Sequence, residues 1–253
     1  MSRRLAVLVS AAVLSFFFAA PNAGAADLKV MGAGAVEEPV NELAAAFTRD
    51  SGHKIEASFG TVGGIEKKLT SGEKADVVIL SAPVMEKLDK AGLLVGATFA
   101  ELGRATAAVG VRAGVAPPDV STPDALKKAL LQAQSVAYTD PAAGGTIGVF
   151  FASLIERLAI ADEIKKKAVL QPGGSGVAAA VANGKADIGI TFISELLPNK
   201  GVQVAGPIPA SIGLVIPYVA AVSSASSQAD AARALIAYMT TPSAREHFKA
   251  AGL

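Results

Sequence analysis

The sequence contains no cysteine and no tryptophan in its 253 residues. The absence of cysteine excludes a disulfide framework, zinc ribbons, iron–sulfur ligation and a thiol nucleophile. Positive and negative charges nearly balance, because the sequence has 23 Lys and Arg residues and 22 Asp and Glu residues. Electrostatic binding of nucleic acids needs a surplus of basic residues, and the 3 Tyr and 10 Phe residues are too scattered for a base-stacking surface. We therefore expect no nucleic-acid partner.

Catalytic and cofactor-binding motifs are also absent from the sequence. It has no P-loop, no H-E-x-x-H pair and no G-x-S-x-G nucleophile turn. The two histidines, His53 and His247, neighbour no serine-and-carboxylate arrangement. Gly32 and Gly34 begin a G-x-G-x-x-G pattern, but Glu37 takes the place of its third glycine. We therefore expect a protein that is not an enzyme and that holds no cofactor and no metal.

No apolar run reaches the roughly 20 residues that span a bilayer. The longest run, residues 5–20, follows Arg3 and Arg4 and precedes A-G-A at residues 23–25. A basic start, a short apolar run and small residues at the cleavage site are the parts of a secretory signal peptide. We predict that residues 1–25 are removed and that the mature protein is periplasmic, where a chain without thiols is safe from oxidation. A membrane anchor is the alternative, and a twin-arginine signal fits less well because Ala6 replaces Phe of that motif.

Apolar residues follow two alternating spacings along the rest of the chain. Short runs that are wholly apolar, or apolar at every second residue, indicate strands, and apolar residues three or four apart indicate helices. Glycines such as Gly72 and Gly92 stand where helices usually end. The alternation predicts an α/β fold with mostly parallel sheets. The expected strands are residues 28–31, 54–59, 77–80, 135–138, 169–170, 188–191 and 214–222, and the expected helices are 36–47, 65–72, 84–91, 122–131, 147–158, 177–181, 228–239 and one that Thr241 opens.

Two stretches of the chain resemble each other. Residues 63–77 and 175–188 each contain a glycine-rich loop, a short helix, a glycine stop and the tripeptide Lys-Ala-Asp before a buried strand. We interpret this echo as two lobes of one design, although any two α/β units have part of the pattern in common. Asp76 and Asp187 take the same place in the two stretches. We expect both to accept main-chain hydrogen bonds rather than to act as catalytic carboxylates.

The loops after the predicted strands have a distinctive composition. Ligands of open α/β sheets bind at these strand ends, where helix N-termini present unpaired N–H groups to anions. The loops contain no Lys, Arg or His, and their acids are Asp140 and Glu195, with Glu37 just beyond the first loop. Glycine N–H groups and hydroxyls suit a compact oxyanion, whereas a larger carboxylate usually meets arginine. The hydroxyl residues, each of which has a helix cap or a turn as its alternative role, are Thr61, Ser81, Thr139, Thr146, Ser175, Thr191 and Ser194.

Four motifs in one order carry a family resemblance. They are V-M-G-A-G-A-V at residues 30–36, F-G-T-V-G-G-I at 59–65, A-D-V-V-I-L-S at 75–81 and N-G-K-A-D-I-G-I at 183–190. The chain resembles the molybdate-type periplasmic solute-binding proteins of ABC transporters, within the type II periplasmic binding proteins, over almost all of its mature length. The resemblance implies a monomer that captures a small anion between two α/β lobes, closes about a hinge and delivers the anion to a membrane permease.

The resemblance also implies a division into lobes and a set of ligand-binding residues. Two strands would cross between the lobes near residues 104–111 and 206–214. Lobe I would then comprise residues 26–107 and 208–253, and lobe II residues 108–207. The implied ligand-binding residues are Gly34, Ala35, Thr61, Val62, Gly63, Ser81, Thr139, Gly145, Thr146, Ser175, Gly176 and Phe192.

The sequence departs from the family at the hydroxyl donors. In the family, a serine of the first loop, a hydroxyl of an F-G-S-S-G-like loop and a tyrosine of a V-Y-A-T-D-like segment hold the oxyanion. The corresponding positions here are Ala35, Thr61-Val62 and Phe192, so that only the Thr61 hydroxyl remains. Two alternatives to an oxyanion carrier therefore stay open.

Both alternatives keep the two-lobed fold. The first is a carrier or sensor of a small organic acid, which requires Arg104 or Arg112 to reach the cleft. The second is an exported enzyme, which requires an acid–base pair drawn from Glu37, Asp140 and Glu195.

Overall fold

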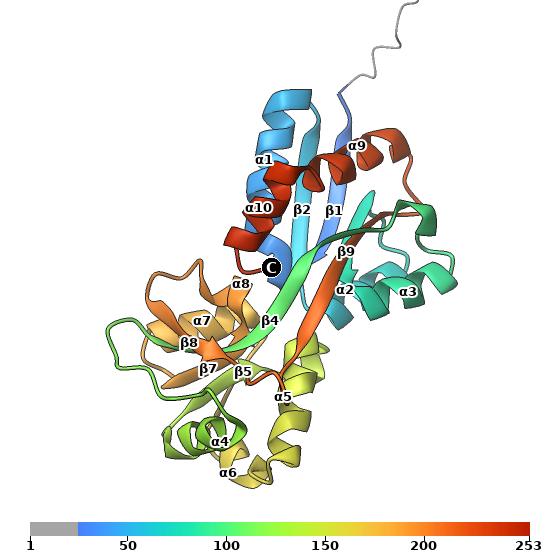
Figure 1. The fold of residues 1–253 in the computed structure, drawn as a ribbon. Coiled ribbons are helices and arrows are strands. Elements are labelled where there is room, and N and C mark those ends of the chain that lie inside the picture. The colour runs from blue at the N-terminus through green and yellow to red at the C-terminus, as the bar shows by residue number, and fades with distance from the viewer. Residues whose placement is uncertain (1–24) are drawn as a thin grey trace, which may run out of the picture.

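The computed structural model describes residues 25–253, so the predicted signal peptide lies outside the described residues except for Ala25. In this part of the chain, no helix is both long and apolar enough to cross a membrane. Strands and helices follow one another in the α/β alternation that the sequence predicts. Two halves, joined by long strands, make up the molecule (Figure 1).

The strands form one curled, mixed sheet. They are β1 (Asp27–Ala33), β2 (Lys54–Gly60), β3 (Val77–Ser81), β4 (Ala100–Arg112), β5 (Val136–Thr139), β6 (Ala168–Gln171), β7 (Ile188–Phe192), β8 (Val202–Pro207) and β9 (Val215–Val222). Their order is β2-β1-β3-β9-β4-β7-β5-β6, with β8 paired to β4. Strands β1 to β3 pair in parallel, as do β5 to β7. The antiparallel pairs all involve β4 or β9. We call β1, β2, β3 and β9 with their helices the first half, and β5 to β8 with theirs the second half.

Strand β4 runs unbroken for 13 residues from one half into the other. Its partner changes from β9 to β7 and β8 between Thr106 and Ala107. The chain returns between Pro207, which ends β8, and Val215, which begins β9 (Figure 1). The lobe boundaries at residues 107 and 208 stay a prediction from the sequence, and this change of partner is the observation that favours them.

Helices surround the sheet. Helix α1 ends at Ser51, and Gly52 follows it with a φ of +77°, a left-handed conformation that favours glycine. Thr122 and Thr241 cap α4 and α10 with their hydroxyls, and a proline follows each of them. The helices are α1 (Glu37–Ser51), α2 (Val62–Thr70), α3 (Ala82–Lys90), α4 (Pro123–Gln132), α5 (Thr146–Arg157), α6 (Ala161–Lys165), α7 (Gly174–Ala182), α8 (Ile193–Leu196), α9 (Ala229–Met239) and α10 (Pro242–Ala250), and the 3-10 turns are η1 (Gly34–Val36), η2 (Gly96–Thr98) and η3 (Pro141–Ala143).

Asp76 and Asp187 have the structural role that the sequence predicts. Asp76 accepts the Lys29 N–H at 2.8 Å through Oδ2 and the Ser226 hydroxyl at 2.6 Å through Oδ1. In the second half, Asp187 Oδ2 accepts the Gln134 N–H at 2.7 Å. Each carboxylate ties the start of its own strand to the neighbouring strand, so the echo between the two halves extends to this contact.

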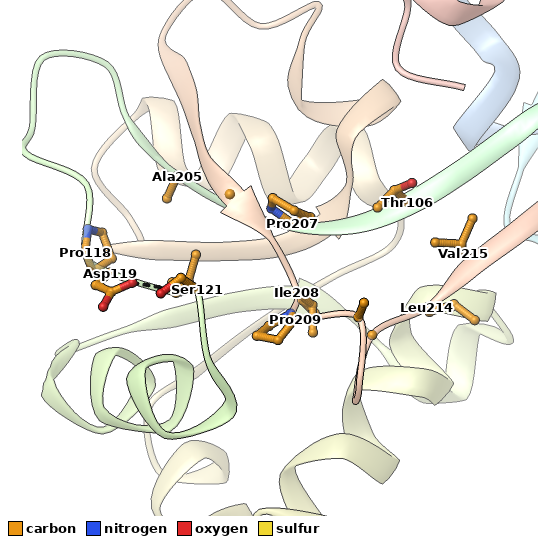
Figure 2. Close-up of a pocket in the computed structure, with 14 residues that line it drawn as sticks. Thr106, Pro118, Asp119, Ser121, Ala205, Pro207, Ile208, Pro209, Leu214 and Val215 are labelled. Atoms are coloured by element: carbon orange, nitrogen blue, oxygen red, sulfur yellow. Dashed lines mark hydrogen bonds between the residues drawn. The ribbon is translucent and has the colours of Figure 1, made fainter.

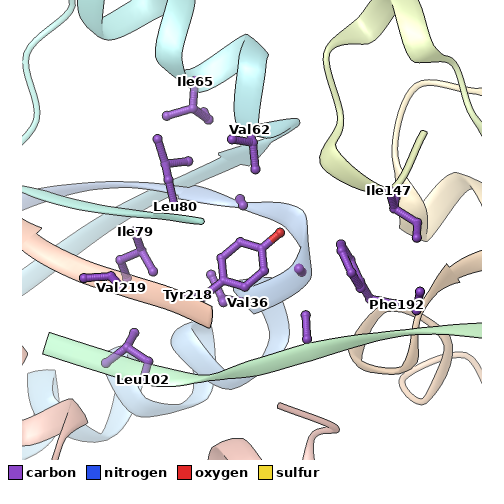
Figure 3. Packing of buried hydrophobic residues seen from close by; sticks show 14 of the residues in the cluster. Val36, Val62, Ile65, Ile79, Leu80, Leu102, Ile147, Phe192, Tyr218 and Val219 are labelled. Carbon is purple, nitrogen blue, oxygen red and sulfur yellow. The ribbon is translucent and has the colours of Figure 1, made fainter. Parts of the chain in front are cut away.

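One hydrophobic core continues through both halves. Strands β3 and β7 are buried along their whole length, as expected for parallel strands that are covered on both faces. Where the halves meet, Phe192 lies edge to face with Tyr218, with ring centroids 6.2 Å apart. The Tyr218 hydroxyl points away from the apolar side chains of β3, toward the side of Ile147 and Phe192 (Figure 3). The core therefore extends beneath the space between the halves.

Candidate functional site

A cavity of about 230 Å³ lies where the two halves meet. Residues at the carboxyl ends of β1, β2, β5 and β7 contribute to it, which is the usual place for a ligand in an open α/β sheet. We call this space the cleft cavity. Its lining residues are Ala33, Gly34, Ala35, Glu37, Phe59, Gly60, Thr61, Val62, Thr139, Gly145, Thr146, Ile147, Pro172, Gly173, Gly174, Ser175, Phe192, Glu195 and Tyr218.

The amino ends of several helices open onto the cleft cavity. Segments η1 and α2 come from the first half and α5 and α7 from the second, and their first residues, Gly34, Val62, Thr146 and Gly174, all line it. The first N–H groups of a helix have no partner within the helix and lie at the positive end of its dipole. Within residues 25–253, no Lys, Arg or His lines the cavity. The cavity therefore offers an anion main-chain N–H groups without a cationic side chain.

Most of the ligand-binding residues predicted from the sequence lie around the cleft cavity. Three do not line it. Gly63 faces Gly144 instead, Ser81 is buried at the end of β3, and Gly176 lies against Gln171. The predicted residues that do line the cavity are Gly34, Ala35, Thr61, Val62, Thr139, Gly145, Thr146, Ser175 and Phe192.

Thr61 uses its hydroxyl to join the two halves. The hydroxyl donates to the Ala143 carbonyl at 2.6 Å and, as the cap of α2, accepts the Gly64 N–H at 3.1 Å. Beside it, the Gly63 N–H donates to the Gly144 carbonyl at 3.0 Å. We call these two hydrogen bonds between the halves the bridge. In this closed arrangement, the Thr61 proton is engaged by Ala143 and is not directed to a ligand.

Other hydroxyls of the cleft cavity remain available. Thr139 is 1% exposed, and its Oγ1 has no hydrogen-bond partner among the described residues. Ser175 is exposed in the first turn of α7. Because a buried hydroxyl without a partner is unfavourable, a ligand oxygen beside Thr139 would satisfy a group that the protein leaves unpaired.

Tyr218 is a cavity residue that the sequence analysis missed. Its side chain is buried, and burial followed by the nearby Glu195 raises the pKa of its hydroxyl, whereas a hydrogen bond with Thr146 lowers it. The hydroxyl therefore keeps its proton and is neutral. The only signal in the sequence is one tyrosine inside the apolar run 214–222, and this pattern does not say that β9 passes beneath the cleft.

The carboxylate of Glu195 forms part of the wall of the cleft cavity. It lies in the first turn of α8, where its Oε2 accepts hydrogen bonds from the Thr191 hydroxyl and from the Phe192 N–H at 3.4 Å. A Cβ atom on Gly34 would lie 3.2 Å from Oε1, and a Cβ atom on Gly174 would collide with Oε2. The carboxylate therefore lies between the amino ends of η1 and α7, where only glycine leaves room for it.

Both glutamates of the cavity hold their protons more tightly than usual. Burial is the main cause that raises the pKa of Glu195, and Glu37 raises it further, whereas the hydrogen bonds from Thr191 and Phe192 lower it. Glu37 is exposed at the rim, and partial burial followed by the charge of Glu38 raises its pKa. Two of the acid–base candidates from the sequence thus face one cavity.

The other charged residues that the sequence analysis considered lie elsewhere. Asp140 caps η3 by accepting the Ala142 N–H at 2.9 Å and does not line the cavity. Arg104 pairs with Glu101 at 2.8 Å on the surface, and neither Arg104 nor Arg112 lines the cleft cavity. The requirement of the organic-acid hypothesis, an arginine in the cleft, is therefore not met in this arrangement. In residues 25–253, no group of three or more His, Cys, Asp or Glu side chains could hold a metal ion.

The cleft cavity continues outward into a second cavity of about 460 Å³, which we call the outer cavity. The two share Gly34, Glu37, Ser175 and Glu195, so the Glu195 carboxylate lies between them. Lys200 lines the outer cavity and is exposed. A cationic side chain is thus present at the entrance and not in the cleft cavity itself.

A third cavity, of about 840 Å³, lies beside the place where the chain crosses between the halves (Figure 2). Thr106 of β4, the return segment between β8 and β9, and the loop before α4 line it, mostly with apolar and proline side chains. In that loop Asp119 accepts the Ser121 N–H at 2.9 Å, which lowers the pKa of Asp119. None of the predicted ligand-binding residues lines this third cavity, so we place the candidate functional site at the cleft cavity.

Comparisons with known proteins find relatives over most of the chain. Residues 28–253 match the family described as bacterial extracellular solute-binding protein. An aconitate isomerase of a Pseudomonas species is 32% identical over 231 residues, which cover 89% of this chain and 87% of that protein. The molybdate-binding protein ModA of Azotobacter vinelandii is 30% identical over 259 residues, which cover 98% of this chain and 96% of that protein.

Solved structures share the two-lobed fold. The periplasmic molybdate-binding protein of Azotobacter vinelandii superimposes with a TM-score of 0.73 at 20% identity, over 89% of this chain and 97% of that one. The sulfate-binding protein SubI of Mycobacterium tuberculosis superimposes with a TM-score of 0.71 at 19% identity, over 90% of this chain and 86% of that one. At these identities the likeness concerns the fold alone.

Proposed function

This chain belongs to the bacterial extracellular solute-binding proteins, and we propose that it captures a small oxyanion of the molybdate type in the cleft cavity and delivers it to an ABC permease. In this proposal residues 1–25 direct the chain to the periplasm and are removed, and the carrier acts as a monomer. The halves close over the anion about the two crossings between them, β4 and the return segment between β8 and β9. No chemical step is needed for this role.

The convergence of helix amino ends on a cavity without cationic side chains carries the proposal. Main-chain N–H groups at Gly34, Val62, Thr146 and Gly174 can surround a compact oxyanion with charge-assisted hydrogen bonds. A cleft cavity of about 230 Å³ is also below the roughly 300–1,000 Å³ of sites for larger organic ligands. Both the donors and the size favour a small, symmetric anion.

Two side chains can replace the hydroxyls that the family has and this chain lacks. Thr139 offers a buried hydroxyl without a partner among the described residues. Tyr218 brings a phenol hydroxyl to the side of Phe192, the position at which the family has its tyrosine. In our proposal these groups and the N–H of Ala35 compensate for the losses at Ala35 and Phe192.

A thermal-shift and calorimetry series with molybdate, tungstate and sulfate tests the proposal on residues 26–253. An anion that binds only the folded protein adds about 2.7 kcal/mol at a hundredfold excess over its Kd, which is a shift of several degrees at this size. Thr139→Ser keeps the hydroxyl and should keep most of the shift, whereas Thr139→Val should reduce it. Absence of binding for every tetrahedral oxyanion at high micromolar concentration would rule the carrier function out.

A second function is favoured by the Glu195 carboxylate, which faces the cleft cavity with a raised pKa. A carboxylate whose pKa is raised is a stronger base than an ordinary one, which suits general base catalysis, and a relative at 32% identity is named an aconitate isomerase. In this alternative, Glu195 takes a proton from a carbon next to a carboxyl group of a small unsaturated acid. The electron pair shifts along the conjugated system, and Glu195 returns a proton, which can exchange with the solvent in between, to a different carbon, with no net oxidation.

Incubation of the protein with cis-aconitate and with trans-aconitate, followed by proton NMR in deuterated water, tests the alternative. Formation of the other isomer with deuterium at one carbon would support it, and Glu195→Gln should then abolish turnover. Asp140→Asn, which changes an acid outside the cavity, should keep it. If neither isomer changes while an oxyanion binds, the carrier function stands alone.

A further inference from the structure

Glu195 engages only one of its two carboxylate oxygens with the protein. Oε2 accepts the Thr191 hydroxyl and the Phe192 N–H, which are the contacts that begin α8. Oε1 lies between Gly34 and Gly174, at 3.2 Å from the position of a Cβ atom on Gly34 and closer still to that of a Cβ atom on Gly174, and it makes no hydrogen bond within residues 25–253. Capping of α8 needs Oε2 alone, so Oε1 is available to a group in the cavity.

Among the described residues, no positive charge near Glu195 in the cleft cavity would offset the negative charge of a bound anion. Glu37 of α1 faces the same cavity, and Tyr218 of β9 keeps its proton and is neutral. Helices α5 and α7 bring no charged side chain to the cleft cavity. On the outer side, Glu38 and Lys200 line the outer cavity with one charge of each sign. A fully ionised oxyanion would therefore lie beside the Glu195 carboxylate without a cationic side chain between them.

A proton between the two groups removes this conflict. Two negative charges at contact distance repel strongly in a partly buried site. A single proton cancels one charge and turns the contact into a charge-assisted hydrogen bond, which is among the strongest in proteins. The burial and the neighbouring Glu37 that already raise the pKa of Glu195 act in the same direction.

We propose that the cleft cavity binds its oxyanion together with one proton, held between Glu195 Oε1 and a ligand oxygen. This inference rests on the proposed carrier function. The proton comes from the solvent or arrives on the ligand, and nothing is oxidised or reduced. A protonated Glu195 with a fully ionised anion has the same composition as an ionised Glu195 with a singly protonated anion. Binding is therefore linked to pH through one site.

This linkage makes Glu195 a determinant of specificity. Phosphate carries a proton of its own near neutral pH, so the ionised Glu195 can accept a hydrogen bond from it. Sulfate carries none, so its binding requires that Glu195 take a proton from the solvent. As pH rises above the pKa of Glu195, the affinity for sulfate should fall more steeply than the affinity for phosphate.

Calorimetry measures the proton directly. Molybdate, which stays fully ionised above pH 6, is titrated into the mature protein at pH 6, 7 and 8 in two buffers with different ionisation enthalpies. We expect proton uptake to approach one per bound anion at pH 8, and Kd to rise up to tenfold per pH unit above the pKa of Glu195. Glu195→Gln, whose amide N–H donates without titrating, should bring the uptake near zero and flatten the pH dependence. Glu38→Gln, a change of equal charge that lies outside the cleft cavity, should leave the uptake unchanged.

The outcomes separate this inference from the proposed function. Molybdate binding by the wild-type protein without proton uptake at any pH would overturn the inference and leave the carrier function intact. Uptake that persists in Glu195→Gln would overturn the assignment to Glu195. Failure of every oxyanion to bind would remove the proposed function itself. The measurement on the wild-type protein needs no variant, so the inference stays testable even if Glu195→Gln does not fold.

Discussion

The Thr61 hydroxyl donates a hydrogen bond of 2.6 Å to the main-chain carbonyl of Ala143, which lies in the other half of the molecule. The same oxygen accepts the Gly64 N–H at the start of α2. One threonine therefore caps a helix at the ligand site and holds the closed arrangement of the cleft. This double role connects local folding of the loop with closure around a ligand.

Thr61→Val should weaken both the cap of α2 and the closure of the cleft. Thr122→Val, which removes only a helix cap, is the control that separates the two effects. Each variant removes a hydroxyl cap, from α2 or from α4 respectively, and each should lower the free energy of unfolding by about 1 kcal/mol. Only Thr61→Val also removes a hydrogen bond of the bridge, so only this variant should bind the anion about five- to tenfold more weakly. Urea denaturation and calorimetry together measure the two effects. Equal affinities in both variants would contradict a role of Thr61 in closure.

Gly63→Ala should weaken closure without weakening the fold. A Cβ atom on Gly63 would lie 2.9 Å from the Gly144 oxygen, too close for the bridge to form as it does here. In the open protein the substitution sits in the first turn of α2, where alanine is a better helix former by roughly 0.5–1 kcal/mol. We expect unchanged or higher thermal stability of the free protein and at least tenfold weaker anion binding. Small-angle scattering should show that saturating anion no longer compacts this variant fully, and wild-type compaction would contradict the prediction.

Ala35→Ser should restore one hydroxyl donor that the family has and this chain lacks. Ala35 lines the cleft cavity from η1 and is 3% exposed. One added hydrogen bond of about 1 kcal/mol to an oxyanion corresponds to roughly five- to tenfold tighter binding. Ala35→Gly, which adds no donor, is the matched control. If molybdate binding is unchanged in Ala35→Ser while the protein stays folded, the anion does not contact this position.

Glu195→Gln should change how stability depends on pH in the absence of ligand. The folded protein raises the pKa of Glu195 above its ordinary value of 4.5. The stability that this glutamate contributes is therefore fully present below pH 4.5 and is lost as pH rises through its pKa in the folded state. Glutamine does not titrate, so the variant should gain stability relative to the wild-type protein between pH 4.5 and pH 8. The gain is at most about 1.4 kcal/mol for each pH unit that separates the two pKa values.

Urea denaturation at pH 4.5 and at pH 8 checks this prediction. The difference in free energy of unfolding between Glu195→Gln and the wild-type protein should be larger at pH 8. A difference that is the same at both pH values would mean that folding does not raise the pKa of Glu195.

Much of the fold can be predicted from the sequence because the spacing of apolar residues indicates which side chains are buried. The run at 77–80 predicts a buried strand and is β3, Val77–Ser81. The observed helix boundaries differ from the predicted ones where glycines occur. Helix α2 begins at Val62, although the apolar spacing predicts a start at Ile65. Gly63 and Gly64 have no side chains that could reveal the helical face. Short elements without periodicity, such as α6, α8 and β8, are not predicted at all.

The loops around the ligand site are predictable for a similar local reason. Glycine-rich stretches after strands mark helix amino ends, and this pattern places Gly34, Thr61, Thr146 and Ser175 at the cleft. The same reasoning includes Ser81, which is buried at the end of β3 and does not line the cavity. Position after a strand is therefore not sufficient, because Ser81 is buried although it pairs with Tyr218, which does line the cavity.

The sequence by itself determined the alternation of strands and helices, the glycine loops and the absence of cationic residues from them, since each depends on neighbours within a few residues. Tertiary structure alone decided that Tyr218 lies under the cleft, that Thr61 meets Ala143, and that Glu195 lies between Gly34 and Gly174. These contacts join residues that are far apart in the chain. They exist because β4 and the return segment between β8 and β9 cross between the halves and bring the helix amino ends of both together around one cavity.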